Sequence, residues 1–169
     1  MEKLIITLIM FVFSVFLWVS DTEEYIQKKA FQKMHYAIQN ATHDAALQVN
    51  KGLLTDGKVD FIESKANEAF KNTIAENVPF DNSLKSKSNL FYSENLTIVL
   101  EKYIDNNFID PVTRSPVKFP YTFSHTTLEG KKYERILFGP SVVMIVKTKI
   151  NGYDTPNEFL SISEYKGYK

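Results

Sequence analysis

The chain has 169 residues, no cysteine, and 20 basic against 20 acidic side chains. The balanced charge gives no support to a nucleic-acid-binding surface, and the absence of cysteine excludes disulfides and thiolate metal sites. About 115 residues follow the N-terminal segments described next, enough for one modest hydrophobic core but not for two domains.

An almost unbroken apolar run, interrupted only by Thr7 and Ser14, extends from Leu4 to Val19. At ~1.5 Å per residue it covers roughly 24 Å, slightly less than a ~30 Å hydrocarbon core. Trp18 suits the headgroup region at one end and Lys3 can reach the interface at the other, which lengthens the span. The run therefore predicts a single-pass membrane anchor over residues 1–20.

A cleaved signal peptide is the main alternative for this run. Such a peptide needs a basic start and small residues at the cleavage site. Glu2 nearly balances Lys3, and a cut after Ser20 would place the bulky Trp18 at the third position before it. An uncleaved anchor is favoured, and a buried core helix is the least favoured, because aromatic and branched residues crowd every face.

The side of the membrane on which the body lies is set by two competing considerations. Lys28, Lys29 and Lys33 follow the run whereas only Lys3 precedes it, so a literal count would place the C-terminal side in the cytoplasm. A body of about 150 residues, however, translocates largely regardless of flanking charge. An extracytoplasmic head is therefore the prediction.

Residues 21–52 predict a long amphipathic helix that continues the anchor. Acidic residues at its start, followed by lysines near i+4 spacing, predict local charge support, and Gly52 offers a stop. No Pro or Gly breaks the chain before Gly52, so a rod over residues 3–51 would be about 73 Å long. Apolar residues three or four apart draw one stripe: Ile26, Ala30, Met34, Ala37, Ile38, Ala41, Ala45 and Val49. Such a stripe needs a partner, either the chain's own head or neighbouring copies.

The remaining residues, 53–169, predict a head of the α+β class. Asp60 and Glu63 suggest a capping box for a helix that runs to about Glu76 and ends before Pro79. A polar loop over residues 82–89 precedes a strand over 95–105, and three prolines make 110–120 an extended loop. Three further strands are predicted at 133–138, 141–150 and 158–163, the middle one central. The fold is therefore a long N-terminal helix packed on a small, mainly antiparallel sheet.

Catalytic motifs are sparse in this sequence. His35 and His43 lie eight residues apart, without the tighter spacing and carboxylate that signal a helical metal site. There is no Gly-rich phosphate loop and no serine nucleophile elbow near His125, which is placed in a loop. The chain is therefore expected to be non-catalytic and to need no cofactor. A bitopic enzyme that uses His125 with Asp110 or Glu129 is a remote alternative.

The segment just beyond the anchor resembles a known family. Gln39, Asn40, Ala41, Asp44, Ala45, Ala46 and Leu47 match the Gln-Asn-Ala-x-x-Asp-Ala-Ala-Leu pattern of pseudopilins of tight-adherence (Tad-type) pili. Pilin-like proteins generally carry a short leader and a Glu near the mature start. This chain has Glu2 but no recognisable processing site, so either it is an unprocessed relative or the resemblance is architectural.

The resemblance implies an assembly role in which anchor helices bundle and heads project outward. Its implied partners are the lipid bilayer and, through the N-terminal helix, further copies or other membrane-anchored subunits. The alternative of a different class is a monomeric, membrane-tethered binding module whose helix folds back on its own sheet.

Overall fold

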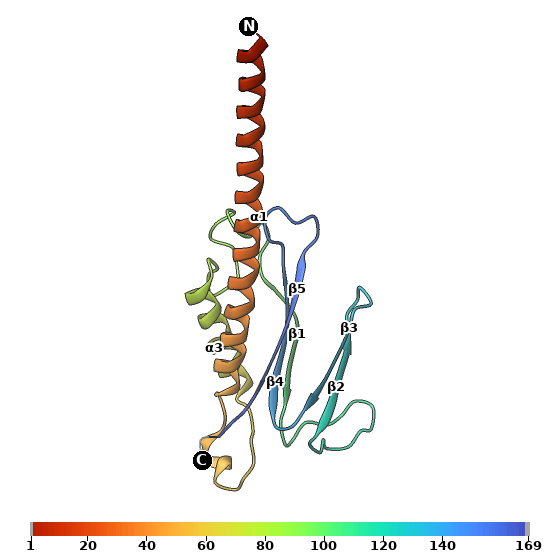
Figure 1. Ribbon diagram of the computed structural model, residues 1–169. Helices are drawn as coiled ribbons and strands as arrows, with labels where there is room; N and C mark the ends of the chain where they lie inside the picture. Colours follow the sequence, from red (N-terminus) through yellow and green to blue (C-terminus); the bar gives the residue numbers. More distant parts are fainter. Residues whose placement is uncertain (1, 168–169) are drawn as a thin grey trace.

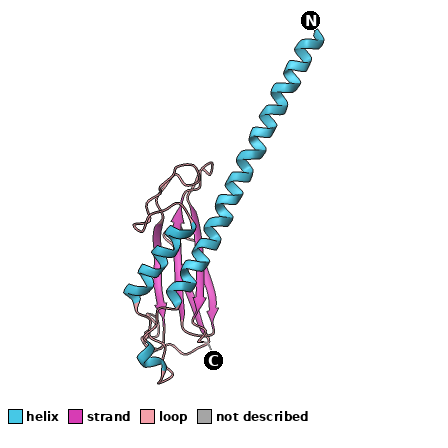
Figure 2. Cartoon of the chain, turned by 90° about the vertical axis from the view of Figure 1, so that its left-hand side faces the viewer, coloured by secondary structure: helices cyan, strands magenta, loops and turns pink. Residues whose placement is uncertain are grey.

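A single helix dominates the computed structural model, which describes residues 2–167 (Figure 1). Helix α1, Glu2–Ala46, has 45 residues and no break, which at ~1.5 Å per residue gives a length of roughly 68 Å. Its first half stands clear of the rest of the chain, while its second half lies along the head (Figure 2). The predicted continuity between apolar run and amphipathic helix is confirmed, as is the α+β class.

The head has three layers, the first of which includes the second half of α1 (Figure 1). The helical layer is α1 with α3, Glu63–Asn77, and the short α2, Lys51–Leu54, lies below them. The middle layer is an antiparallel sheet in the order β1-β4-β5, and the outer layer is the antiparallel hairpin β2-β3. The strands are β1 Thr97–Ile104, β2 Tyr121–Thr126, β3 Lys132–Leu137, β4 Ser141–Thr148 and β5 Asn157–Glu164.

Strand β4 is the centre of the head. Val142, Met144 and Val146 point into the apolar cluster beneath the helices, whereas Val143 belongs to the cluster beneath the hairpin. Because both faces of β4 are covered, its sequence is a nearly continuous apolar run rather than an alternation. The prediction of a central strand here is confirmed.

The apolar stripe, which lies on α1 except for Val49 just beyond its end, is part of the core of the head. Ile26 is half-buried, and the other seven stripe positions are buried in the cluster beneath the helices: Ala30, Met34, Ala37, Ile38, Ala41, Ala45 and Val49. The same cluster contains Phe70 of α3 and Phe159 of β5. The partner of the stripe is thus the chain's own head, and segments 21–52 and 53–169 share one core.

Truncating one of these core side chains is expected to destabilise the head strongly. Ile38, 1% exposed, should lose about 2–5 kcal/mol of unfolding free energy as Ile38→Ala, the usual range for a buried aliphatic side chain. Urea unfolding of the detergent-solubilised chain measures it. Tyr36→Ala, two residues away but 64% exposed, is the matched control and should change stability by less than about 0.5 kcal/mol.

The end of α1 differs from the prediction. The helix ends at Ala46, and Gly52 lies inside α2, where its N–H donates to the Oδ1 of Asn50. The reason is a competing extended pairing: Asn50 N–H donates to the carbonyl of Asp60. This pairing and the bridge between Val49 and Phe61 hold the backbone extended, so helix formation stops six residues before the glycine.

The capping box predicted for α3 is wrong. The N-cap position is Ile62, whose side chain makes no capping hydrogen bond. Asp60 lies outside the helix, where its carboxylate accepts a hydrogen bond of 3.1 Å from the Asn107 side chain. Tertiary contacts to the loop after β1 therefore decided where the helix begins.

Strand β2 was missing from the prediction. Tyr121 and Phe123 alternate with Thr122 and Ser124, a pattern typical of a half-buried strand, but the preceding prolines masked it. His125 belongs to this strand and pairs with Tyr133 of β3, so its placement in a loop was wrong.

Candidate functional site

The first half of α1 offers a fully exposed apolar surface. Every residue from 4 to 19 is exposed, and Phe11 and Trp18 are 65% and 70% exposed. Within residues 2–167 one helix is long and apolar enough to cross a membrane, and none of its most apolar stretch is buried. Exposed apolar surfaces of this size mark sites that contact a membrane or another protein. The helix is therefore compatible with a membrane span or a signal helix, and it is not a core helix of this chain.

Two threonines in and beside this segment donate hydrogen bonds to the preceding turn of the helix. Thr7 Oγ1 donates to the carbonyl of Lys3 at 2.9 Å, and Thr22 Oγ1 donates to the carbonyl of Trp18 at 2.8 Å. Such bonds to the preceding turn remove the cost of placing a free hydroxyl in an apolar medium. Thr7 therefore does not count against a span.

The head begins a short distance beyond the apolar run. Ile26 is the first half-buried residue, seven positions after Val19, which corresponds to roughly 10 Å along the helix. The headgroup layer beyond a hydrocarbon core is about 5–8 Å thick on each side. If the run spans a bilayer, the near end of the head lies just outside the headgroups.

Tyr92 fixes the place where the helix leaves the head. Its ring is buried against Phe80 at a centroid distance of 5.0 Å, and its hydroxyl donates to the carbonyl of Ala30 at 3.0 Å. Burial raises the pKa of the Tyr92 phenol above its ordinary value, which favours the neutral donor form. On the other side of α1, Phe31 packs on Phe159 at 5.0 Å.

Removal of the Tyr92 hydroxyl tests this attachment. Tyr92→Phe keeps the ring and its packing but leaves the hydroxyl's hydrogen bond to Ala30 unmade, so the unfolding free energy should fall by about 1 kcal/mol. Amide hydrogen exchange of the helix around Ala30 should quicken more than exchange in β4. Tyr153→Phe, at a residue that is 36% exposed, should leave both quantities unchanged.

The outward face of α1 at this junction carries unpaired charge. Among residues 2–167 the ion pairs are Lys132 with Glu134 and Lys147 with Glu129, so neither the acidic turn nor the lysines that follow it form one. The acidic turn is Asp21, Glu23 and Glu24, and the lysines are Lys28, Lys29 and Lys33. Lys29 instead lies 5.5 Å from the centre of the exposed Tyr25 ring. The predicted charge support within the helix is therefore not made by direct ion pairs.

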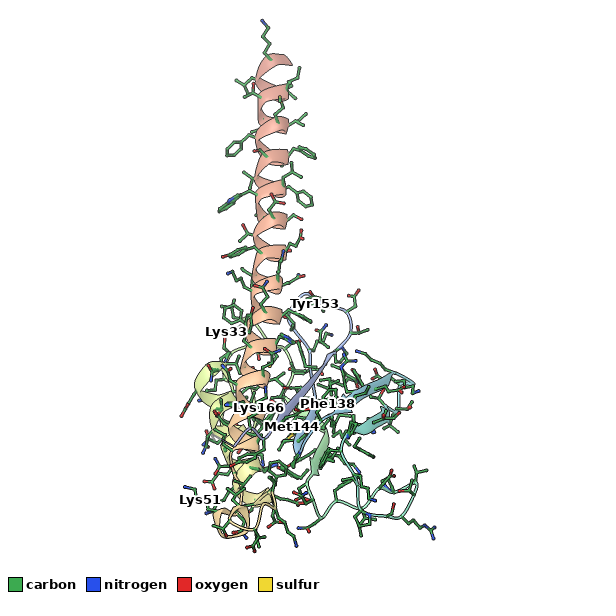
Figure 3. The ribbon with its side chains drawn as sticks, turned by 60° about the horizontal axis from the view of Figure 1, so that its bottom comes forward. Lys33, Lys51, Phe138, Met144, Tyr153 and Lys166 are labelled. Carbon is green, nitrogen blue, oxygen red and sulfur yellow. The ribbon has the colours of Figure 1, made fainter. Side chains whose placement is uncertain are left out.

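Two hollows accompany the helix where it meets the head. One, of about 380 Å³, is lined by Lys29, Ala30, Gln32, Lys33, Tyr36, Pro79, Phe91 and Tyr92. The other, of about 280 Å³, lies on the β5 side and is lined by Phe31, Gln32, His35, Tyr36, Glu158, Phe159 and Leu160. Figure 3 shows Lys33 and Tyr153 at this end of the head, on either side of the helix.

A larger hollow of about 640 Å³ lies between β3 and β5. Its lining mixes apolar and charged groups, among them His43, Arg135 and Glu164. The Glu164 carboxylate already accepts the N–H of Phe138 at 2.9 Å, and His43 lies 3.5 Å from the hydroxyl of Ser163. No nucleophile with an adjacent base and orienting group is assembled in this hollow of the described chain.

The predicted histidines are dispersed. His35 contacts Gln39 at 3.1 Å on the exposed face of α1, while His125 lies in β2 on the far side of the sheet. Within residues 2–167 no group of three histidine, cysteine or acidic side chains is arranged to hold a metal ion.

The carboxylates considered as partners of His125 have other partners. Asp110 accepts the N–H of Val112 at 2.7 Å in a turn, and Glu129 pairs with Lys147. Throughout the described residues no hydrogen bond or ion pair joins either carboxylate to His125. The structure thus does not bring the proposed catalytic groups together.

No known protein family, curated protein or solved structure matches this chain.

Proposed function

We propose that this chain is a non-catalytic, membrane-anchored assembly subunit of a pilus-like or secretion apparatus, with its head outside the cytoplasm. The observation that supports the proposal is the difference in burial between the two halves of α1. The helix is unbroken. Its first half is apolar and exposed, and one face of its second half is buried in the core of the head. This is the layout that the pseudopilin resemblance implies.

The burial of the stripe bears on which surface of α1 would join copies. Ala41 and Ala45 are fully buried against the head, so sister helices have no access to them. Contacts between copies through α1 would therefore use its exposed positions, which are continuous from Leu4 to Tyr25. Small residues and shape, rather than hydrophobic burial, govern packing within lipid, and Ser14 is the small residue at the middle of the run.

A monomeric, membrane-tethered binding module is the second candidate. It is favoured by the same burial, because the stripe has its partner within the chain and needs no neighbour. The two candidates differ in what the exposed half of α1 contacts: other protein helices in an assembly, or only lipid in a monomer.

Membrane fractionation combined with cysteine crosslinking tests the proposal. The chain has no cysteine, so a single Ser14→Cys substitution introduces one exposed thiol in the apolar run. An assembly subunit should be found in the membrane fraction, yield dimers or ladders with a long, flexible thiol-to-thiol reagent that tolerates an axial offset between copies, and expose its head to external protease. A strictly monomeric Ser14→Cys probe would favour the tethered module, and a protected head would overturn the extracytoplasmic orientation. Cysteine at Ala41 is unsuitable, since that position is 0% exposed.

A further inference from the structure

We propose that the groove beside Lys29 and Lys33 receives the acidic turn, residues 21–25, of a second copy of this chain. This inference rests on the proposed function, in which copies associate through α1, and it names the surface and the register of that contact. The partner is a copy displaced along the helix axis, not one at the same level.

The groove combines an apolar floor with a basic rim. Phe91 and Tyr92 lie with ring centres 6.4 Å apart on the floor, and the Tyr92 hydroxyl is already used on the carbonyl of Ala30. The floor therefore offers apolar surface, while the two lysines stand at the edge formed by α1. A matching ligand carries an aromatic or aliphatic group between negative charges.

The acidic turn has this composition. Tyr25 is 61% exposed, and Asp21 lies one turn before it on the same face of the helix. Glu24 follows on the adjoining face. None of these carboxylates forms an ion pair within residues 2–167, and the same holds for the lysines of the rim.

The spacing of the charges sets the register. Lys29 follows Asp21 by eight residues, and Lys33 follows Tyr25 by eight, so a copy shifted by eight residues brings Asp21 level with Lys29. This shift is roughly 12 Å at ~1.5 Å per residue. Two parallel copies at the same level would instead face lysine with lysine and carboxylate with carboxylate, which is repulsive.

The acidic turn cannot pair with the rim lysine of its own chain. Within one helix Asp21 and Lys29 are separated by the same ~12 Å and cannot meet. In the displaced copy, about half of the apolar run no longer lies beside the apolar run of its neighbour. That surface needs cover from other helices, so the contact belongs to an assembly rather than to a pair of copies side by side in a bilayer.

Crosslinking between two differently tagged full-length copies tests the register in detergent solution, where the micelle covers the withdrawn apolar surface and no bilayer holds the two helices at one level. One copy carries Glu24→Cys and the other Gln32→Cys, positions that the proposed shift brings level. The mixed 24–32 product should exceed the 24–24 and 32–32 products. Adding Lys29→Glu and Lys33→Glu to the second copy should lower the mixed product several-fold, because the attraction of these lysines to Asp21 of the first copy becomes a repulsion. Adding Asp21→Lys to the first copy should then restore it.

Controls separate this inference from the function on which it rests. Lys65→Glu, an exposed reversal on α3 outside the groove, should leave the mixed product unchanged, and an unaltered thermal unfolding midpoint shows that each variant folds. Same-residue products alone, or a mixed product indifferent to the lysine reversals, would overturn the groove contact while leaving assembly intact. Loss of every crosslink, including that of Ser14→Cys, would overturn both.

Discussion

Deleting residues 1–52 is expected to leave the remaining chain, 53–169, unfolded. The deletion removes α1 and with it one wall of the core under the sheet. Met34, Ile38 and Val49 alone each contribute about 1.5–3 kcal/mol of burial. Their sum is comparable to the whole stability of a small domain, about 5–15 kcal/mol.

The matched control is a chain of residues 21–169, which keeps the stripe and loses only the apolar run. It should be soluble, unfold cooperatively on heating and give dispersed amide resonances, whereas 53–169 should give neither a cooperative transition nor dispersion. Cooperative unfolding of 53–169 would contradict the shared core.

A charge placed at the centre of the apolar run is expected to detach the chain from membranes without destabilising its head. Val12 is 60% exposed and lies near the middle of the run. On insertion scales an arginine there costs about 2.5–3.5 kcal/mol, in addition to the lost valine. Val12→Arg should therefore shift most of the chain from the carbonate-resistant membrane fraction to the soluble or aggregated fraction.

Tyr25→Arg introduces the same charge on an equally exposed position beyond the run and should leave the chain in the membrane fraction. The unfolding midpoint of the head should be the same in both variants, because neither residue is in the core cluster. Retention of Val12→Arg in the membrane at the level of the parent chain would show that the run is not the anchor.

Sequence periodicity predicted the elements that depend on local pattern. The spacing of Ala30, Met34 and Ile38 identified the buried face of α1, and the continuous apolar run of β4 identified the central strand. Periodicity does not show what covers an apolar face, so the stripe was compatible both with packing against sister helices and with packing against the head. Only the positions of α3 and β5 resolve the choice.

The errors arose where distant contacts outweigh local signals. Gly52 is a good helix stop, but the pairing of Val49 with Phe61 ends α1 earlier. Asp60 is a residue type that commonly caps helices, but its carboxylate accepts a hydrogen bond from Asn107, 47 residues further along the chain. The groove could not be read from sequence at all, because Phe91 and Lys33 are distant along the chain and meet only through the fold.

The continuity of α1 gives the molecule a mechanical property. A helix without proline or glycine resists bending over these lengths, so tilting the first half turns the head as one lever. Tension applied to that half enters the head along the axis of α1, roughly parallel to the strands (Figure 1). The force then acts as shear on all contacts between the helix and the sheet together. It does not separate the strands one after another.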